Sequence, residues 1–162
     1  MNTFGMRFLE RLAFLFILSL LVGCAEPFDQ EVIHTIDDGT WSYEEPLVFD
    51  FNIDDTSAVY TFFMDIDHSI DYPFQNLYTK IQTTYPDTEV KQDVLSFELC
   101  DNFGLWQGKC RGDLCKVRVP LQTKARFKAT GSYQLSFEQY TRRDSLSGLR
   151  QLALRVVKEE GF

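Results

Sequence analysis

The sequence is poor in basic residues and in histidine. It holds 16 Lys and Arg against 24 Asp and Glu, which gives a formal net charge of −8, and it has two histidines. Nucleic-acid binding depends on Lys and Arg that neutralise phosphates, so this charge balance argues against a nucleic-acid partner. There is no Gly-x-Ser-x-Gly motif, and neither His34 nor His68 stands in a recognisable nucleophile motif. We therefore expect no enzymatic activity and no catalytic residues.

Residues in patterns that would hold a metal or a cofactor are also scarce. Cys110 and Cys115 lack the second ligand pair of a zinc site. Asp65, Asp67 and Asp71 have the spacing of some calcium loops, but they lack the glycine and glutamate of an EF-hand. We interpret Asp65 and Asp67 as solvated carboxylates on the outer face of a strand, with a structural calcium ion as the alternative. No phosphate-binding or dinucleotide motif is present, so we expect no cofactor and no metal.

The chain has one long hydrophobic run, and it is short for a membrane span. The run extends over residues 12–22, which measure about 16 Å as a helix against a hydrocarbon core of about 30 Å. Such a run, preceded by Arg7 and Arg11, is typical of a signal peptide. It ends at Gly23-Cys24, which resembles a bacterial lipobox. The alternatives are an ordinary signal peptide with an incidental cysteine, or an uncleaved anchor.

The lipobox predicts that residues 1–23 are removed and that Cys24 is lipidated. Three acyl chains on this residue are enough for stable anchoring. The residue after Cys24 is alanine rather than the aspartate that retains lipoproteins in the inner membrane, which favours the outer membrane. Without residues 1–23 the basic residues fall from 16 to 14 and the acidic residues from 24 to 23, so the net charge becomes −9. The mature chain is thus an acidic domain on a lipid anchor.

Beyond the signal peptide the compartment is oxidising, so a disulfide is expected. Cys100, Cys110 and Cys115 permit one bridge and one free thiol, and the sequence does not choose the pair. Cys110 and Cys115 are a candidate pair, because they enclose a short loop that contains glycine. The Arg-Gly-Asp tripeptide of this loop is interpreted as turn chemistry.

Hydrophobic alternation with a period of two dominates the mature chain and predicts β-strands. It is clearest over residues 47–53 and recurs in several further runs separated by turn residues. These expected strands are 58–67, 77–83, 94–100, 116–121 with Pro120 at its end, the pair 126–130 and 133–140, and 152–157. Residues 144–149 are expected to form one helical turn. This pattern predicts an all-β fold, an antiparallel, jelly-roll-like β-sandwich over residues 47–162, preceded by an extended leader at 24–46 that packs against it.

Aromatic residues are abundant, at 15% of the chain, which makes disorder improbable. β-Sandwiches with exposed aromatic rings can bind sugars, and a surface glycan-binding lipoprotein of a polysaccharide-utilisation system is the alternative function. The candidate platform residues are Trp41, Tyr43, Tyr72, Tyr78 and Trp106. An exposed coplanar pair would favour this alternative, whereas buried tryptophans would count against it.

Four sequence features together resemble a known family. They are Cys24 with Phe28-Asp29, then His68-Ser69 leading into Asp71-Tyr72-Pro73-Phe74-Gln75-Asn76-Leu77, then Gly104-Leu105-Trp106-Gln107-Gly108 with Gly112-Asp113, and finally residues 148–158. In this order they resemble the GldH family of gliding-motility lipoproteins of Bacteroidetes.

The resemblance implies a non-enzymatic outer-membrane lipoprotein that is required for gliding and linked to the type IX secretion machinery. Its partners would be the membrane, through the lipid anchor, and other envelope proteins of gliding and secretion. The loops at residues 72–77 and 104–113 are the candidate contact surfaces. Their candidate contact residues are Tyr72, Pro73, Asn76, Trp106 and Asp113.

Overall fold

The computed structural model describes residues 28–159, so Cys24 and the predicted signal peptide lie outside the described residues. The described part is a single domain made almost entirely of antiparallel β-strands, and this confirms the predicted all-β sandwich class. The one helical element in it is the short 3-10 turn η1 (Asp37–Gly39). Within residues 28–159 no helix is long and apolar enough to cross a membrane.

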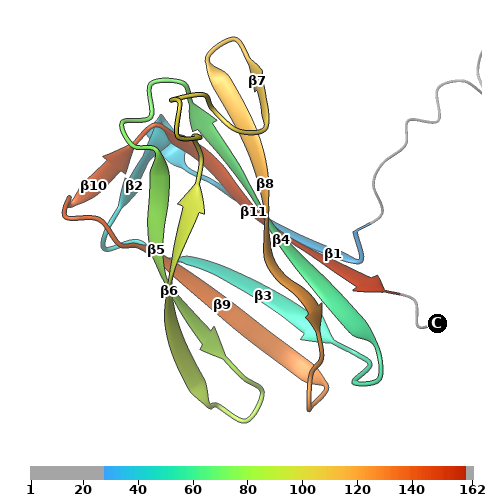
Figure 1. Cartoon of the computed structure of the whole chain (residues 1–162). Coiled ribbons are helices and arrows are strands. Elements are labelled where there is room, and N and C mark those ends of the chain that lie inside the picture. The colour runs from blue at the N-terminus through green and yellow to red at the C-terminus, as the bar shows by residue number, and fades with distance from the viewer. Residues whose placement is uncertain (1–27, 160–162) are drawn as a thin grey trace, which may run out of the picture.

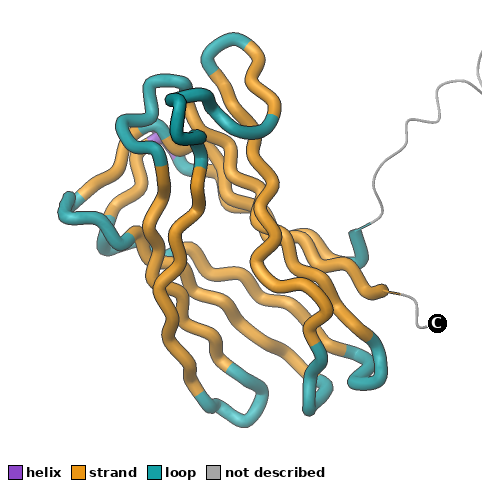
Figure 2. The backbone as a smooth tube through the Cα atoms, in the orientation of Figure 1, coloured by secondary structure: helices purple, strands orange, loops and turns teal. Residues whose placement is uncertain are grey.

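Two sheets face each other (Figure 1). The five-stranded sheet has the order β1 (Gln30–Thr35), β11 (Leu149–Glu159), β4 (Val59–Ser69), β8 (Leu114–Ala125) and β7 (Lys109–Arg111). The four-stranded sheet has the order β3 (Leu47–Ile53), β9 (Gly131–Gln139), β5 (Asn76–Thr84) and β6 (Val90–Glu98). A small third sheet pairs β2 (Thr40–Ser42) with β10 (Ser145–Ser147). Figure 2 shows that the connecting loops gather at the ends of these strands.

The period-two pattern explains the strands and the core. In β3, Phe49, Phe51 and Ile53 are buried while Asp50 and Asn52 are exposed, and the strand has the predicted bounds. Aromatic edge-to-face contacts then hold the layers together. Phe51 of the four-stranded sheet meets Phe62 of the five-stranded sheet with ring centroids 5.0 Å apart. Burial of such rings is the main favourable term in the stability of the sandwich.

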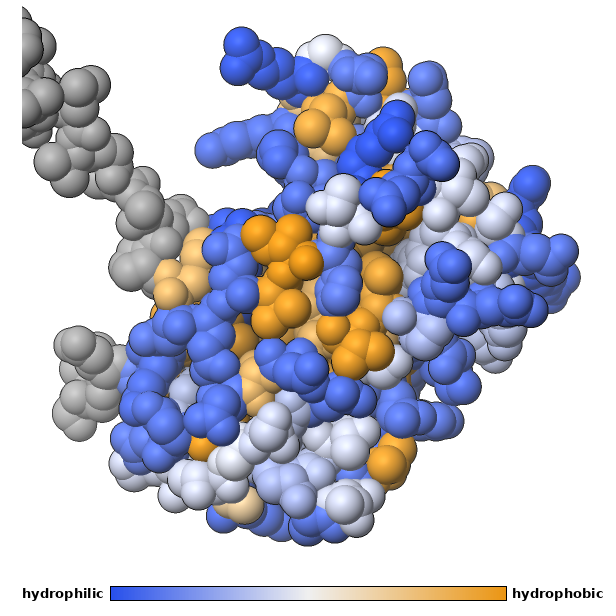
Figure 3. All heavy atoms as spheres, turned by 180° about the vertical axis from the view of Figure 1, so that it is seen from behind, coloured by the Kyte–Doolittle hydropathy of each residue, from blue (hydrophilic) through white to orange (hydrophobic). Residues whose placement is uncertain are grey.

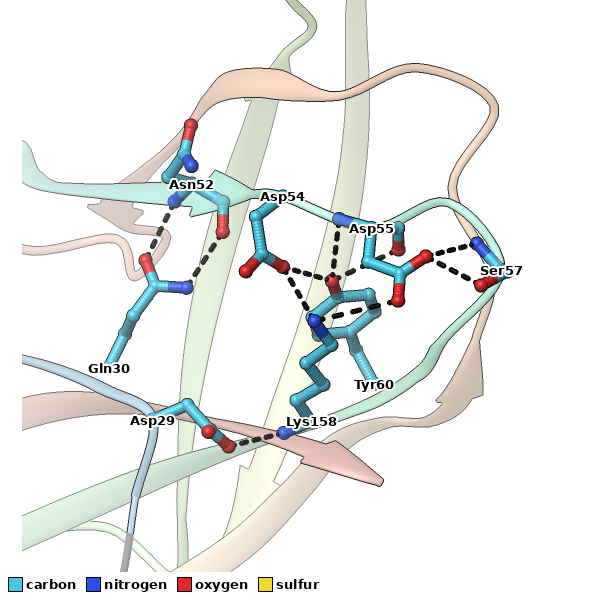
Figure 4. A network of polar contacts seen from close by, with 8 residues as sticks. All are labelled: Asp29, Gln30, Asn52, Asp54, Asp55, Ser57, Tyr60 and Lys158. Atoms are coloured by element: carbon cyan, nitrogen blue, oxygen red, sulfur yellow. Dashed lines mark hydrogen bonds and ion pairs between the residues drawn. The ribbon is translucent and has the colours of Figure 1, made fainter. Parts of the chain in front are cut away.

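Polar side chains close the sandwich along the β1–β3 side (Figure 4). The Gln30 side chain donates to the Asn52 carbonyl oxygen and accepts from the Asn52 amide, both at 2.7 Å, as a neighbouring strand would. The Lys158 ammonium lies 3.0 Å from the Asp54 carboxylate and 3.6 Å from that of Asp55. These bonds link the first residues of β1 and the last of β11 to the end of β3.

Charges line the outer face of the five-stranded sheet. Asp65 accepts hydrogen bonds from Arg118 at 2.7 Å and from Arg155 at 2.5 Å. Burial alone would raise the pKa of Asp65, but these two guanidinium groups outweigh it and hold the pKa below its usual value. Asp67 is 6% exposed and pairs with Lys116. The prediction that Asp65 and Asp67 are solvated carboxylates is therefore wrong: both are neutralised by cross-strand partners.

Several local predictions also differ from the structure. Strands begin at Gln30 rather than at Leu47, because residues 30–42 of the expected leader supply β1 and β2. Pro120 does not end its strand. β7 pairs with β8 only as far as Lys116, so this edge of β8 is unpaired at Pro120 and tolerates the missing N–H.

Two expected elements near the C-terminus are absent from the described chain. Residues 126–130 form no strand, so β9 pairs with β3 and β5 instead of with its predecessor. Residues 145–147 form the strand β10 rather than a helical turn, because Leu146 is buried opposite Trp41 of β2. In both places the short sequence pattern is compatible with more than one secondary structure, and packing against the rest of the domain determines which one forms.

The outer surface is mostly hydrophilic on one face of the molecule. Seen from behind in Figure 3, hydrophilic side chains cover most of this face, and several apolar side chains gather near its centre.

The buried contact between Phe49 and Phe137, with centroids 5.4 Å apart, yields a first prediction. Phe137 has no exposed surface. Phe137→Ala should lower the free energy of unfolding by about 3–5 kcal/mol, measured by urea denaturation, because it removes a large core ring and leaves a cavity. Ser136→Ala on the same strand should change it by less than about 1 kcal/mol. Equal losses in the two variants would contradict this assignment of the core.

Candidate partner-binding loops

Three loops meet at the end of the sandwich where β4 stops. They are residues 70–75 between β4 and β5, residues 99–108 between β6 and β7, and residues 112–113 at the β7–β8 turn. We call them the loop cluster. The Ile70 amide donates to the Asp113 carbonyl oxygen at 2.9 Å, and the Leu99 and Cys100 amides donate to the Gln75 carbonyl oxygen at 2.9 and 3.0 Å. The structure thus brings together the two loops that the sequence singled out.

His68 is the centre of the loop cluster. The alternation of β4 places it on the inner face after Met64 and Ile66, and its side chain has no exposed surface. The ring of Trp106 lies 4.7 Å from the imidazole and the ring of Tyr72 lies 5.8 Å from it, centroid to centroid. One histidine therefore holds both predicted loops by ring contacts.

The hydrogen bonds of His68 leave one nitrogen unused. Nδ1 donates to the Ser69 carbonyl oxygen at 2.9 Å, whereas Nε2 is buried and has no partner among the described residues. Burial lowers the pKa of the imidazole below its ordinary value, so the ring is neutral in the folded protein at neutral pH. A neutral ring with a bare Nε2 costs less to bury than an imidazolium would.

The predicted contact residues take different positions in the loop cluster. Tyr72 is buried, its hydroxyl donates to the Asn76 carbonyl oxygen at 3.3 Å, and burial raises the pKa of this hydroxyl. Pro73 and Asp113 are exposed, while Asn76 and Trp106 are half-buried. Tyr72 and Trp106 therefore support the loops from within, and Pro73 and Asp113 are available at the surface.

A disulfide joins Cys110 of β7 to Cys115 of β8, directly opposite each other in the hairpin, with Cα atoms 4.0 Å apart. Cys100 is a free thiol. Gly108 precedes this hairpin at a close approach of two backbones. Its φ is +80°, and a Cβ there would lie 2.2 Å from the Lys116 carbonyl oxygen, so only glycine fits.

The sequence analysis did not single out the most exposed apolar residues of the loop cluster. Phe103 is 90% exposed and Leu105 is 67% exposed. The Asp101 carboxylate accepts from the amides of both, at 2.8 and 2.9 Å, and the Asp101 amide donates to the Leu105 carbonyl oxygen. The Asp-Asn-x-Gly turn signal was readable, but which of its side chains point outward was not.

Comparison with known proteins places this arrangement in a family. A family model described as GldH lipoprotein matches residues 30–156, which include every strand of the domain in whole or in part. The chain belongs to the GldH lipoprotein family. Membership confirms the resemblance seen in the sequence, and it makes the protein a gliding-motility lipoprotein held at a membrane.

Individual relatives agree with the family assignment. A gliding motility lipoprotein GldH homolog of Christiangramia forsetii is 24% identical over 157 residues, which are 91% of this chain and 94% of the relative. The gliding motility lipoprotein GldH of Flavobacterium johnsoniae is 21% identical over 127 residues, 74% of this chain and 79% of that protein.

A solved structure of infectious bursal disease virus Gx strain is similar at a TM-score of 0.34 and 15% identity, over 87% of this chain and 37% of that one.

The buried imidazole predicts a pH dependence of stability. Its folded-state pKa is lowered, so the unfolded chain binds more protons below the ordinary histidine pKa of about 6.5. The contribution of His68 to the free energy of unfolding should therefore be constant above that pH and become less favourable as the pH decreases from about 6.5 to 5. His68→Leu should remove this contribution from the pH profile. Parallel pH profiles for the two proteins, measured by urea denaturation, would show that His68 is not the titrating group.

Proposed function

We propose that the chain is anchored to the outer membrane through acyl chains on Cys24 and supports gliding by contacting other envelope proteins. Those partners belong, in this proposal, to the machinery that links gliding to type IX secretion. The loop cluster is the contact surface, and the protein acts by binding rather than by catalysis.

The observation that carries this proposal is the exposed pair Phe103 and Leu105. Large apolar side chains that remain exposed at a structured turn are typical of protein-interaction sites. Here the turn is held by Asp101 rather than left free. A preorganised turn loses little conformational entropy when a partner binds.

The position of the loop cluster supports a role in contact at a distance from the membrane. Gln30 at the start of β1 pairs with Val156 of β11, and Val156 pairs with Phe62 of β4, so the three residues lie at the same height along the sheet. From Phe62 to Ser69 at the loop cluster the strand advances seven residues, or about 23 Å. The chain leaves towards Cys24 at the Gln30 end, so the loop cluster lies at the opposite end.

The glycan-binding alternative loses its main candidates. Trp41 is 2% exposed, and its indole nitrogen donates to the Glu45 carbonyl oxygen at 2.7 Å. Trp106 is half-buried and packed on His68. Trp41 leaves no open ring face for a sugar, and Trp106 contacts His68, whereas the candidates Tyr43 and Tyr78 remain exposed at 49% and 45%.

Lipidation is tested by Cys24→Ala in the full-length protein. The wild-type protein should incorporate radiolabelled palmitate and sediment with the outer-membrane fraction, whereas the variant should incorporate none and leave that fraction, because no sulfur remains for diacylation. Cys100→Ala is the matched control and should keep both properties. Palmitate labelling of Cys24→Ala would refute the lipobox.

The contact surface is tested in a gliding host from which the gene has been deleted. Deletion should abolish colony spreading and secretion of motility adhesins, and the wild-type gene should restore both. The double variant Phe103→Asp and Leu105→Asp should be produced at normal levels yet fail to restore spreading, because charge at a contact centre is costly to desolvate.

Tyr43→Asp changes another exposed aromatic residue, 49% exposed, outside the loop cluster and serves as the control. It should restore spreading fully. Full rescue by the Phe103/Leu105 double variant would exclude this turn as the contact surface, and normal motility of the deletion strain would overturn the proposed function itself.

A further inference from the structure

The two sheets diverge on the side opposite the β1–β3 contact and leave a groove between β6 and β8 of about 770 Å³. Its floor is formed by half-buried hydrocarbon side chains of both sheets and of the 126–130 loop, chiefly Leu95, Leu121, Phe127 and Leu135. Its volume is within the range of small-molecule sites, about 300–1,000 Å³.

The polar groups lie mostly along the mouth of the groove, and the positive ones are concentrated on one rim. Residues 124–128 alternate Lys124, Arg126 and Lys128 with the inward-facing Ala125 and Phe127. The Arg126 side chain donates to the Ser57 carbonyl oxygen at 3.3 Å, whereas the ammonium groups of Lys124 and Lys128 make no ion pair with the described residues. The opposite rim carries Asp87, Glu89 and Asp93 with Lys91 among them, so the 124–128 rim is the one suited to an anion.

The strand edges beside the groove disfavour an added peptide strand. On β8, Pro120 lacks an N–H and Lys124 has a φ of +54°, which interrupts a regular ladder. On β6, Lys91 and Asp93 are exposed charges of the kind that protect sheet edges. An occupant that needs no backbone partners fits better than a strand.

The register places the mouth at the end of the sandwich that faces the anchor. Gln30, Val156, Phe62 and Gln122 are opposite one another on successive strands, so β8 at Gln122 lies about 14 Å across the sheet from Gln30. Cys24 is four residues before Phe28, at most about 14 Å of extended chain. A ligand that comes from the membrane requires the proposed anchoring at Cys24.

We propose that this groove binds one acyl chain of a membrane-derived long-chain fatty acid. The hydrocarbon tail lies on Leu95, Leu121, Phe127 and Leu135, and the carboxylate lies against Lys124 and Lys128. An anionic single-chain amphiphile matches both the apolar floor and the basic rim, which a neutral ligand would not use.

The experiment uses the lipidated full chain in phosphatidylcholine vesicles with a photoactivatable sixteen-carbon fatty acid, and the cross-linked peptides are mapped by mass spectrometry. Cross-links should concentrate on residues 121–135 and around Leu95, and excess palmitate should suppress them. The double variant Lys124→Gln and Lys128→Gln should reduce them about fivefold, since two exposed charge contacts are lost. Lys109→Gln, which changes an exposed lysine of β7, should leave them unchanged.

Leu121→Glu tests the floor, and its folding is checked by circular dichroism. A folded variant should lose the cross-links, while Thr123→Glu, exposed on the same strand, should retain them. Cross-links spread evenly over the surface, equal competition by methyl palmitate, or displacement by an alternating apolar peptide would overturn the proposal. Binding of the probe at the same residues of purified Cys24→Ala protein would support the groove independently of the anchor, whose failure is read separately from palmitate labelling of that variant.

Discussion

The structure depends on β4, an eleven-residue strand that is hydrogen-bonded on both sides, to β11 and to β8. Its inward-facing side chains from Tyr60 to His68 form the base of the core, and its outward-facing Asp65 is held by arginines from both neighbours. A strand that is paired on both edges cannot shift by one residue without turning its apolar face outward. This constraint fixes the register of the whole five-stranded sheet and delivers His68 to the place where the loops meet.

The two ends of the sandwich are built by different means. At the Gln30 end, side-chain hydrogen bonds and the Lys158 ion pairs join the sheets in a solvent-exposed seam. At the other end a buried histidine, two aromatic rings and a disulfide hold three loops together. The exposed seam tolerates substitution better, because each of its ion pairs contributes little, while the buried end depends on shape.

Much of this could be predicted from the sequence, and the failures have physical reasons. Residues 47–53 were predicted to their bounds, because alternation of Phe and Ile with Asp and Asn leaves one solution. Residues 126–130 also alternate, yet they form no strand: β9, their expected partner, pairs with β3 and β5 instead, and the 126–130 loop lies beside the groove. The alternation of β4 predicts that His68 faces inward. The neighbouring sequence does not predict that its Nε2 has no partner or that Trp106, distant in sequence, contacts the ring, because both depend on tertiary packing.

The pairing of β1 with β11 has a mechanical consequence. The Gln30 end of β1 is the end nearest Cys24 in the sequence, and the loop cluster lies beyond its Thr35 end, so under the proposed function a force between membrane and partner would run along the strand axis. All six residue pairs from Gln30–Val156 to Thr35–Gln151 then resist sliding together, instead of opening one at a time as they would if pulled sideways. Such a force would load the β1–β11 pair in shear, and this geometry would let a small domain transmit a pulling force without unfolding from its tethered end.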